Sequence, residues 1–249
     1  MGLAIEKDKC YTAADFFEWE PDSGERYELA DGGAYMMAGC SRRHEEINDN
    51  LFMLIRGALK GKPCRVYSEN FAVRLFPDLE RKDNCVFLPD IFVVCDRKKL
   101  DERACNGAPD LIIEVLSPST ARFDRLVKFN KYLEACVKEY WIVDPELNTI
   151  QVHRLGTTNN SCAAILHRLC PHFFAQNALH KPIMLALLGF KLWANSAQSC
   201  LPLVIRRALL QNKRYVTSVY NDEAKIDVLS LPGLTINTQD VFTAEEEGI

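Results

Sequence analysis

The sequence predicts an α/β protein, with a mixed β-sheet whose centre is buried, flanking α-helices and an extra inserted segment. Two runs, at 86–96 and 110–116, are apolar almost throughout, which is typical of strands buried on both faces. Amphipathic helices are predicted at 41–61 and 124–137, so helices and strands alternate along the chain. This alternation indicates a sheet with helices packed on its faces.

Each further element has its own local signal. The first long helix begins at Ser41, a good N-cap, and reaches Gly61, which favours a helix end. The segment at 26–38 alternates in polarity and turns at Asp31-Gly32-Gly33, as a β-hairpin does. A short helix is predicted at 11–19. The remaining predicted strands are at 64–69, 71–76, 139–145, 149–155, 214–220, 224–230 and 234–242.

The strand pattern stops after Leu155 and resumes at Arg214. The intervening residues 156–213 contain no acid and hold three of the five histidines. We expect one domain formed by 1–155 and 214–249, and an insertion at 156–213 that is partly helical or poorly ordered. The insertion offers four possible zinc ligands, with a spacing that fits no standard finger: Cys162, His167, Cys170 and His172.

Composition and charge narrow the class of protein. Of 249 residues, 48% are hydrophobic and 26% are charged, as in ordinary globular proteins. A net charge of −4 lacks the basic character of many nucleic-acid-binding proteins, although a local basic face can suffice. The ten cysteines form no CxxC pair, and no apolar run reaches the roughly 18 residues of a membrane helix. We expect a cytoplasmic protein with reduced thiols and no membrane partner.

Two acids stand in the predicted buried strands. Glu114 lies inside the run LIIEVL, and Asp90 follows Pro89 at the start of the run IFVV. A buried carboxylate is costly unless it is paired or binds a cation. On neighbouring strands ~5 Å apart, two carboxylates suit a hard divalent cation whose shell is completed by water. Buried ion pairs or strand-end caps are the structural alternative.

The helix after Glu114 carries a candidate lysine. Asp124, Lys128 and Tyr132 recur at i, i+4 and i+8, so they share one helix face. Lys128 either orients water and stabilises a phosphoryl oxygen, or is a solvated charge paired with Asp124. Lys131 competes for the same role.

Two further residues have open roles. His44 lies near the start of the first long helix, where it is either solvated or delivered to the cation site. Glu28 stands between Tyr27 and Leu29 in the predicted hairpin and should point away from their face. It either joins the acids or faces solvent.

Six motifs, in order along the chain, carry a family resemblance. They are YELADG at 27–32, SRRH at 41–44, LPDIFVV at 88–94, PDLIIEVLSPST at 109–120, DRLVKFNKY at 124–132 and EYWIVDP at 139–145. Together they resemble the Uma-two family of restriction-endonuclease-like proteins, within the PD-(D/E)XK nuclease superfamily. The likeness extends to 215–242 and leaves out 156–213.

The resemblance implies a restriction-endonuclease-like fold and a phosphodiesterase site that uses Mg²⁺ or Mn²⁺. It matches Asp90 to the first acid of the family motif and Glu114 to the second, with the backbone carbonyl of Val115 as a further metal ligand. The superfamily lysine would stand at Leu116, and Lys128 on the next helix is expected to replace it.

His44 and Glu28 match recurrent family positions near the site. The resemblance therefore implies an endonuclease that acts on nucleic acid, with DNA expected over RNA, and a homodimer. The displaced lysine, the acidic charge balance and the insertion leave one alternative open. It is a nuclease-fold module that binds nucleic acid or another partner, with weak or lost catalysis.

Overall fold

The computed structural model describes residues 9–18, 26–37, 39–77, 83–156, 214–221 and 223–243. Residues 157–213 lie outside these ranges, so the predicted insertion and its zinc-site hypothesis stay predictions. Within the described ranges, no helix is both long and apolar enough to cross a bilayer.

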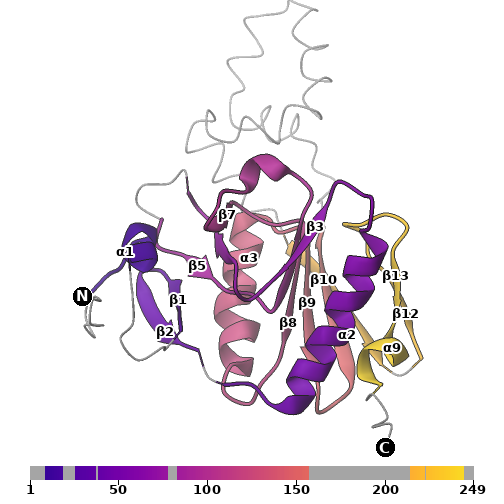
Figure 1. Cartoon of the computed structure of the whole chain (residues 1–249). Helices are drawn as coiled ribbons and strands as arrows, with labels where there is room; N and C mark the ends of the chain where they lie inside the picture. Colours follow the sequence, from indigo (N-terminus) through magenta and orange to yellow (C-terminus); the bar gives the residue numbers. More distant parts are fainter. Residues whose placement is uncertain are drawn as a thin grey trace, which may run out of the picture. The chain divides into compact units, whose positions relative to one another are not determined.

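A six-stranded sheet forms the centre of the described fold (Figure 1). Its order is β11-β10-β9-β8-β6-β3. β8 pairs in parallel with β9, whereas β6 pairs antiparallel with both β8 and β3, which confirms the predicted mixed sheet. The strands are β3 (Arg65–Ser68), β6 (Ile91–Val94), β8 (Leu111–Val115), β9 (Glu139–Asp144), β10 (Thr149–Gly156) and β11 (Arg214–Asn221).

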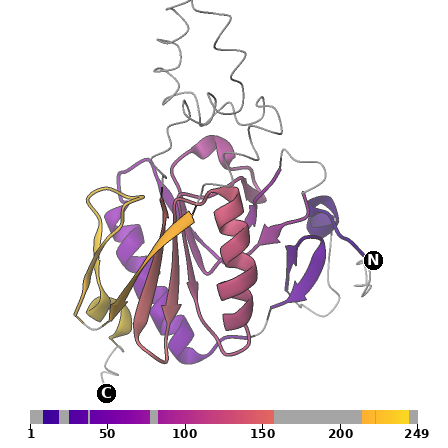
Figure 2. The same ribbon diagram turned by 180° about the vertical axis from the view of Figure 1, so that it is seen from behind.

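The two faces of this sheet carry different cores, because alternate residues of a strand point to opposite faces. Helix α2 (Arg42–Ala58) packs on the face of Ile113, together with the C-terminal elements. Tyr132 of helix α3 (Phe129–Ala135) packs on the face of Ile112. Figures 1 and 2 show the two helices on opposite sides of the sheet. The C-terminal elements are β12 (Lys225–Asp227), β13 (Thr235–Asn237) and α9 (Thr238–Phe242).

A second sheet, of five strands, has the order β2-β1-β5-β4-β7 and packs against α1 (Ala13–Glu18). Its hairpin turns at Asp31 and Gly32, with φ angles of 50° and 81°, as predicted. A Cβ on Gly32 would also lie 2.2 Å from Cys10 Sγ, so both backbone angle and space require glycine. The strands are β1 (Tyr27–Ala30), β2 (Gly33–Met36), β4 (Ala72–Arg74), β5 (Val86–Phe87) and β7 (Ala104–Asn106).

The single strand predicted at 86–96 is wrong. β5 belongs to the five-stranded sheet and β6 to the six-stranded sheet. Pro89 lies between them and has no N–H to give to a strand ladder, so it interrupts the run. As a result, Asp90 stands where the chain passes from one sheet to the other.

Two more predicted elements need correction. The helix predicted at 124–137 begins as a π-helix, η2 (Phe123–Lys128), before α3. The strand predicted at 234–242 ends at Asn237, because the Asn237 side chain accepts the N–H of Gln239 and caps α9. Strand β7 and the short 3₁₀-helix η1 (Arg97–Lys99) were not predicted.

The expectation of reduced thiols is wrong for two cysteines. Cys64 and Cys95 form a disulfide with a Cα–Cα distance of 3.9 Å. They flank the paired strands β3 and β6, whose register sets Arg65 opposite Val94 and brings the next pair together. Among the described residues, Cys10, Cys40, Cys85 and Cys105 are free cysteines.

Candidate active site

Asp90 directly precedes β6, and Glu114 lies in β8, the antiparallel neighbour of β6, so the two acids are close to the arrangement on adjacent strands that the sequence predicted. Ile91 pairs with Ile113, and one further step along this register sets Asp90 opposite Glu114. Both carboxylates are buried. Asp90 Oδ2 accepts the Val115 N–H at 2.7 Å, which fixes the first acid to the strand of the second.

Lys128 reaches the site from η2, the position that the family resemblance implied for it, and is not a solvated charge. Its Nζ lies 3.0 Å from Glu114 Oε1 and 3.4 Å from Asp124 Oδ1. The competing Lys131 does not join it, because its Nζ binds Asp31 Oδ1 at 2.5 Å outside the cluster. Leu116, at the position of the superfamily lysine, packs in the apolar core beneath α3. The lysine therefore comes from the helix rather than from the strand.

Glu28 joins the acids from β1, which decides between its two predicted roles. Its Oε1 lies 3.0 Å from Lys128 Nζ and accepts the Leu88 N–H at 2.8 Å. The side chain is 4% exposed as part of the five-stranded sheet, so it is not a solvent-facing charge. The two sheets meet at this carboxylate, since Leu88 leads directly into Pro89 and Asp90.

His44 is delivered by the N-terminus of α2. Ser41 caps this helix by accepting the His44 backbone N–H at 3.2 Å, and the imidazole Nε2 lies 3.4 Å from Asp90 Oδ2. Burial alone would lower the pKa of His44, but the hydrogen bond and charge of Asp90, with the charge of Glu45, outweigh it and raise the pKa. A backbone hydrogen bond to Val115 acts in the same direction.

Two residues of the cluster, Asp124 and Tyr132, were placed on the lysine's helix face but not among the candidate site residues. Asp124 is 2% exposed, and its Oδ1 has no hydrogen-bond partner among the described residues, although Lys128 Nζ is 3.4 Å away. Tyr132 OH donates to Glu114 Oε1 at 2.8 Å. The i, i+4, i+8 spacing was the signal that could have identified both.

The cluster holds more negative than positive charge. Among the described residues, Lys128 is surrounded by buried carboxylates of four acids: Glu28, Asp90, Glu114 and Asp124. Burial raises the pKa of Glu114 well above its ordinary value, against the opposing charge of Lys128. Burial likewise raises the pKa of Glu28 and Asp124. Burial would lower the Lys128 pKa, but the surrounding carboxylates raise that pKa well above its ordinary value, so the ammonium stays charged.

The acids line a pocket together with Val115 and Lys128. Within the described part of the chain, the hydrogen bonds that these acids accept from protein go to Asp90 Oδ2 and Glu114 Oε1, which leaves Asp90 Oδ1 and Glu114 Oε2 open to a ligand. Hard carboxylate oxygens facing one pocket, with surplus negative charge around them, fit a divalent cation such as Mg²⁺ or Mn²⁺. The other lining residues include Tyr35, Met36, Met37, Cys40, His44, Glu69, Ser117, Ser119, Thr120 and Phe123.

A family model identifies the protein family to which this chain is related. The model of the Uma2 family, described as "Putative restriction endonuclease", matches residues 13–169, which is more than half of the 249 residues. The chain belongs to the Uma2 family. The match contains all five candidate site residues and ends before the C-terminal strands at 214–242, where the sequence resemblance continues. The catalytic roles of the five residues stay predictions.

A solved structure shares the Uma2 chain's fold. It is described as "a putative nuclease belonging to DUF820", from Anabaena variabilis, with a TM-score of 0.57 and 16% identity. The superposition covers 93% of this chain and 97% of the other. The likeness shows the fold alone, and with the mixed sheet it confirms the predicted restriction-endonuclease-like architecture.

Two relatives from Synechocystis are named as uncharacterized proteins. The protein slr1290 is 31% identical over 118 residues, which are 47% of this chain and 60% of slr1290. The protein sll1609 is 26% identical over 145 residues, or 57% of this chain and 79% of sll1609. The chain therefore spans less than two thirds of slr1290, and neither name assigns an activity.

Proposed function

We propose that this protein is a divalent-metal-dependent endonuclease that hydrolyses phosphodiester bonds of nucleic acid. The observation that carries the proposal is the position of Asp90 and Glu114. Asp90, just before β6, and Glu114, in the neighbouring strand β8, face one pocket, with Lys128 Nζ 3.0 Å from the second acid. Membership of a family described as a restriction endonuclease supports the same class of reaction.

In this proposal Asp90 and Glu114 hold one Mg²⁺ or Mn²⁺, and the backbone carbonyl of Val115 contributes a further oxygen. When bound, such a cation polarises a phosphoryl oxygen and lowers the pKa of bound water. The Val115 N–H and Tyr132 OH each bind one oxygen of an acid, so they orient the two carboxylates toward the pocket.

Lys128 supplies a fixed positive charge beside the reacting phosphate. Glu28 and Asp124 hold its ammonium group from two sides, and both are buried, so the group keeps one position. An ammonium in this position stabilises negative charge that develops on a phosphoryl oxygen and orients the attacking water. His44 contacts Asp90 and adjusts the orientation of that carboxylate.

Plasmid cleavage tests the proposal. Wild-type protein should cleave supercoiled or single-stranded DNA when Mg²⁺ or Mn²⁺ is added, and Asp90→Ala and Glu114→Ala should not. Equal cleavage by all three proteins, or none by any, would contradict it. Salt-dependent DNA binding without turnover would instead favour the alternative of a nuclease-fold binding module.

Metal binding should stabilise the protein more at high pH than at low pH. The raised pKa values of Glu28, Glu114 and Asp124 mean that protonation stabilises the fold below their unfolded pKa values of ~4. That stability is lost as pH rises through the raised folded pKa values. The pKa of Lys128 is also raised, so this residue makes the stability of the fold depend on pH only above its unfolded pKa of ~10.4.

A divalent cation replaces the lost protons at high pH. We therefore expect the rise in Tm caused by Mn²⁺ to be larger at about pH 8 than at about pH 5.5. Thermal unfolding with and without Mn²⁺ at the two pH values measures this difference. Asp90→Asn is the control and should reduce the rise at both. A rise that is equal at the two pH values, or larger at the lower one, would contradict the proposed cation site.

The pocket rim offers an aromatic surface for an unstacked base. Tyr35 is 44% exposed and lies 4.5 Å, centroid to centroid, from Phe123. Phe123 in turn lies 5.9 Å from Lys128 Nζ. Aromatic stacking contributes roughly 1–3 kcal/mol per base, so Tyr35→Ala should raise the KM for single-stranded DNA by about tenfold.

The same change should leave hydrolysis of bis(p-nitrophenyl) phosphate, a phosphodiester without bases, unaffected. Steady-state kinetics on the two substrates measures the split, with Tyr35→Phe as the matched control that keeps the ring. An equal loss on both substrates would show that Tyr35 acts on the site rather than on a base.

A further inference from the structure

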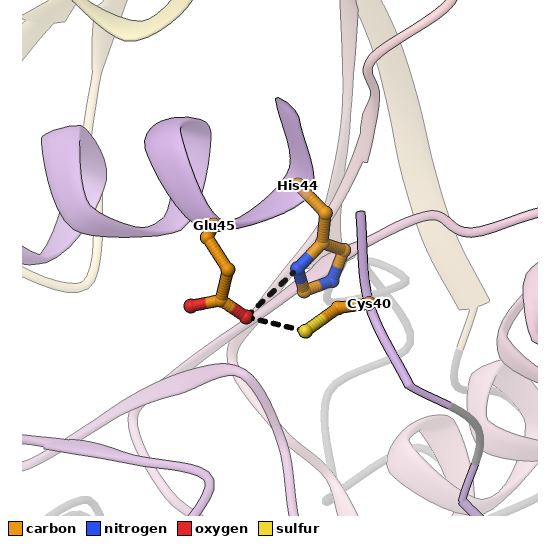
Figure 3. Close-up of side chains that lie close together, drawn as sticks. All are labelled: Cys40, His44 and Glu45. Carbon is orange, nitrogen blue, oxygen red and sulfur yellow. Dashed lines mark hydrogen bonds and ion pairs between the residues drawn. The ribbon is translucent and has the colours of Figure 1, made fainter. Parts of the chain in front are cut away.

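Cys40 and Glu45 have no part in the proposed hydrolysis, and their side chains lie close to His44, the residue that contacts Asp90. Cys40 precedes α2, and His44 and Glu45 stand in its first turn (Figure 3). The Cys40 thiol donates to Glu45 Oε1 at 2.6 Å, and His44 Nδ1 lies 3.7 Å from the same oxygen. Their ligand atoms all lie within 4.8 Å of one another. Tetrahedral zinc sets its ligand atoms roughly 3.3–3.8 Å apart, so small side-chain rotations would complete such a site.

The imidazole supplies an independent observation. His44 is 6% exposed, and its Nδ1 is buried without a hydrogen-bond partner among the described residues. Figure 3 shows this nitrogen directed toward Glu45, with Cys40 beside it. A buried polar atom without a hydrogen bond is unfavourable, so a ligand at this position would stabilise it.

The other ring nitrogen already has the partner that a metal-binding histidine needs. Nε2 lies 3.4 Å from Asp90 Oδ2, so in the neutral imidazole Nε2 carries the proton and Nδ1 presents its lone pair. A bound cation takes the place of the proton that the imidazolium would carry on Nδ1. Metal-ligating histidines usually donate their second N–H to a carboxylate in this way. The tautomer favoured by Asp90 is therefore the one that binds metal through Nδ1.

We propose that Cys40, His44 and Glu45 bind a borderline divalent cation such as Zn²⁺ at the rim of the pocket. The thiolate and imidazole ligands distinguish this site from the carboxylate site, since they select zinc over Mg²⁺ and Mn²⁺. On binding, the cation replaces the thiol proton that Glu45 now accepts, and that proton passes to solvent. Cys40 and Glu45 are exposed, which gives the ion an entry path and leaves the fourth position to water.

Cobalt substitution tests the site by a direct readout. Co²⁺ added to the full-length protein should produce the near-ultraviolet charge-transfer band of a thiolate ligand. Cys40→Ser should remove the band, and Glu45→Gln should weaken Co²⁺ binding by about tenfold or more. Competition with Zn²⁺ should abolish the band in the wild type. The exposed positions of the two substituted residues leave the fold unchanged, which circular dichroism verifies.

Two controls separate this site from other thiols. Cys10→Ser removes another exposed free thiol, and Cys162→Ser with Cys170→Ser removes two thiols of the predicted insertion. Both proteins should keep the band. Absence of the band in wild type, its persistence in Cys40→Ser, or its loss in the Cys162/Cys170 variant alone would overturn the proposal. None of these readouts depends on nuclease activity.

Discussion

Replacing Lys128 with methionine is expected to abolish DNA cleavage and to destabilise the protein by about 3–5 kcal/mol, the usual cost of breaking a buried ion pair. The methionine keeps most of the side-chain volume but removes the ammonium that lies within 3.4 Å of Glu28, Glu114 and Asp124. Urea unfolding at neutral pH and plasmid cleavage measure the two effects. Because the acids then gain protons more readily, the loss of stability should shrink as pH falls.

Lys131→Met is the matched control, three residues along the same helical segment. Lys131 binds Asp31, whose side chain is 68% exposed, so this pair contributes at most about 1 kcal/mol. Cleavage should remain at the wild-type level. The assignment of the lysine fails if the two methionine variants unfold at the same urea concentration, or if Lys128→Met still cleaves DNA.

Glu114→Gln is expected to lower cleavage by at least about 100-fold while raising Tm in metal-free buffer near pH 8. The pKa of Glu114 is raised well above its ordinary value by burial, so its ionised form is less stable in the folded than in the unfolded protein. Glutamine removes that charge, keeps the shape and still accepts the Tyr132 hydroxyl. Scanning calorimetry and plasmid cleavage measure the two opposite changes.

Glu139→Gln is the control for the combination of lower cleavage and higher Tm that we expect of Glu114→Gln. Glu139 is equally buried on the neighbouring strand β9, but its two oxygens accept donors from Trp141, Arg154 and Ser230. The glutamine side chain would place its NH₂ group where an oxygen of Glu139 now accepts hydrogen bonds, so donors would face donors. The variant should therefore be less stable than wild type but should still cleave DNA. A Glu114→Gln protein that is less stable than wild type at pH 8 would show that Glu114 is a structural ion-pair partner and not a strained site acid.

The acids of the site could be predicted from the sequence because buried strands rarely hold a carboxylate. Glu114 and Asp90 were conspicuous against their apolar neighbours, and the structure sets them opposite one another. The helical spacing placed Lys128 on one face with Asp124 and Tyr132, but it left open whether the lysine is solvated, and only the family resemblance favoured the site. The predicted shared face holds although the segment begins as a π-helix, because the side chains of Asp124, Lys128 and Tyr132 are all buried.

Other features depend on contacts that no local pattern contains. Glu28 could be placed on a strand, but its contact with Lys128 arises only where the two sheets meet. The division of 86–96 between those sheets depends on tertiary strand pairing, although Pro89, which cannot donate a ladder hydrogen bond, indicated that the strand could be interrupted there. The Cys64–Cys95 disulfide follows from the register of β3 and β6, which the spacing of the cysteines does not reveal.

Asp90 and Glu114 are proposed to hold one hard divalent cation together. Equilibrium Mn²⁺ binding, followed by electron paramagnetic resonance, tests this directly on wild type, Asp90→Asn, Glu114→Gln and the control Lys131→Met. We expect wild type and control to bind Mn²⁺ alike, and each acid variant to bind it at least about tenfold more weakly. Equal Mn²⁺ binding by all four proteins would contradict it.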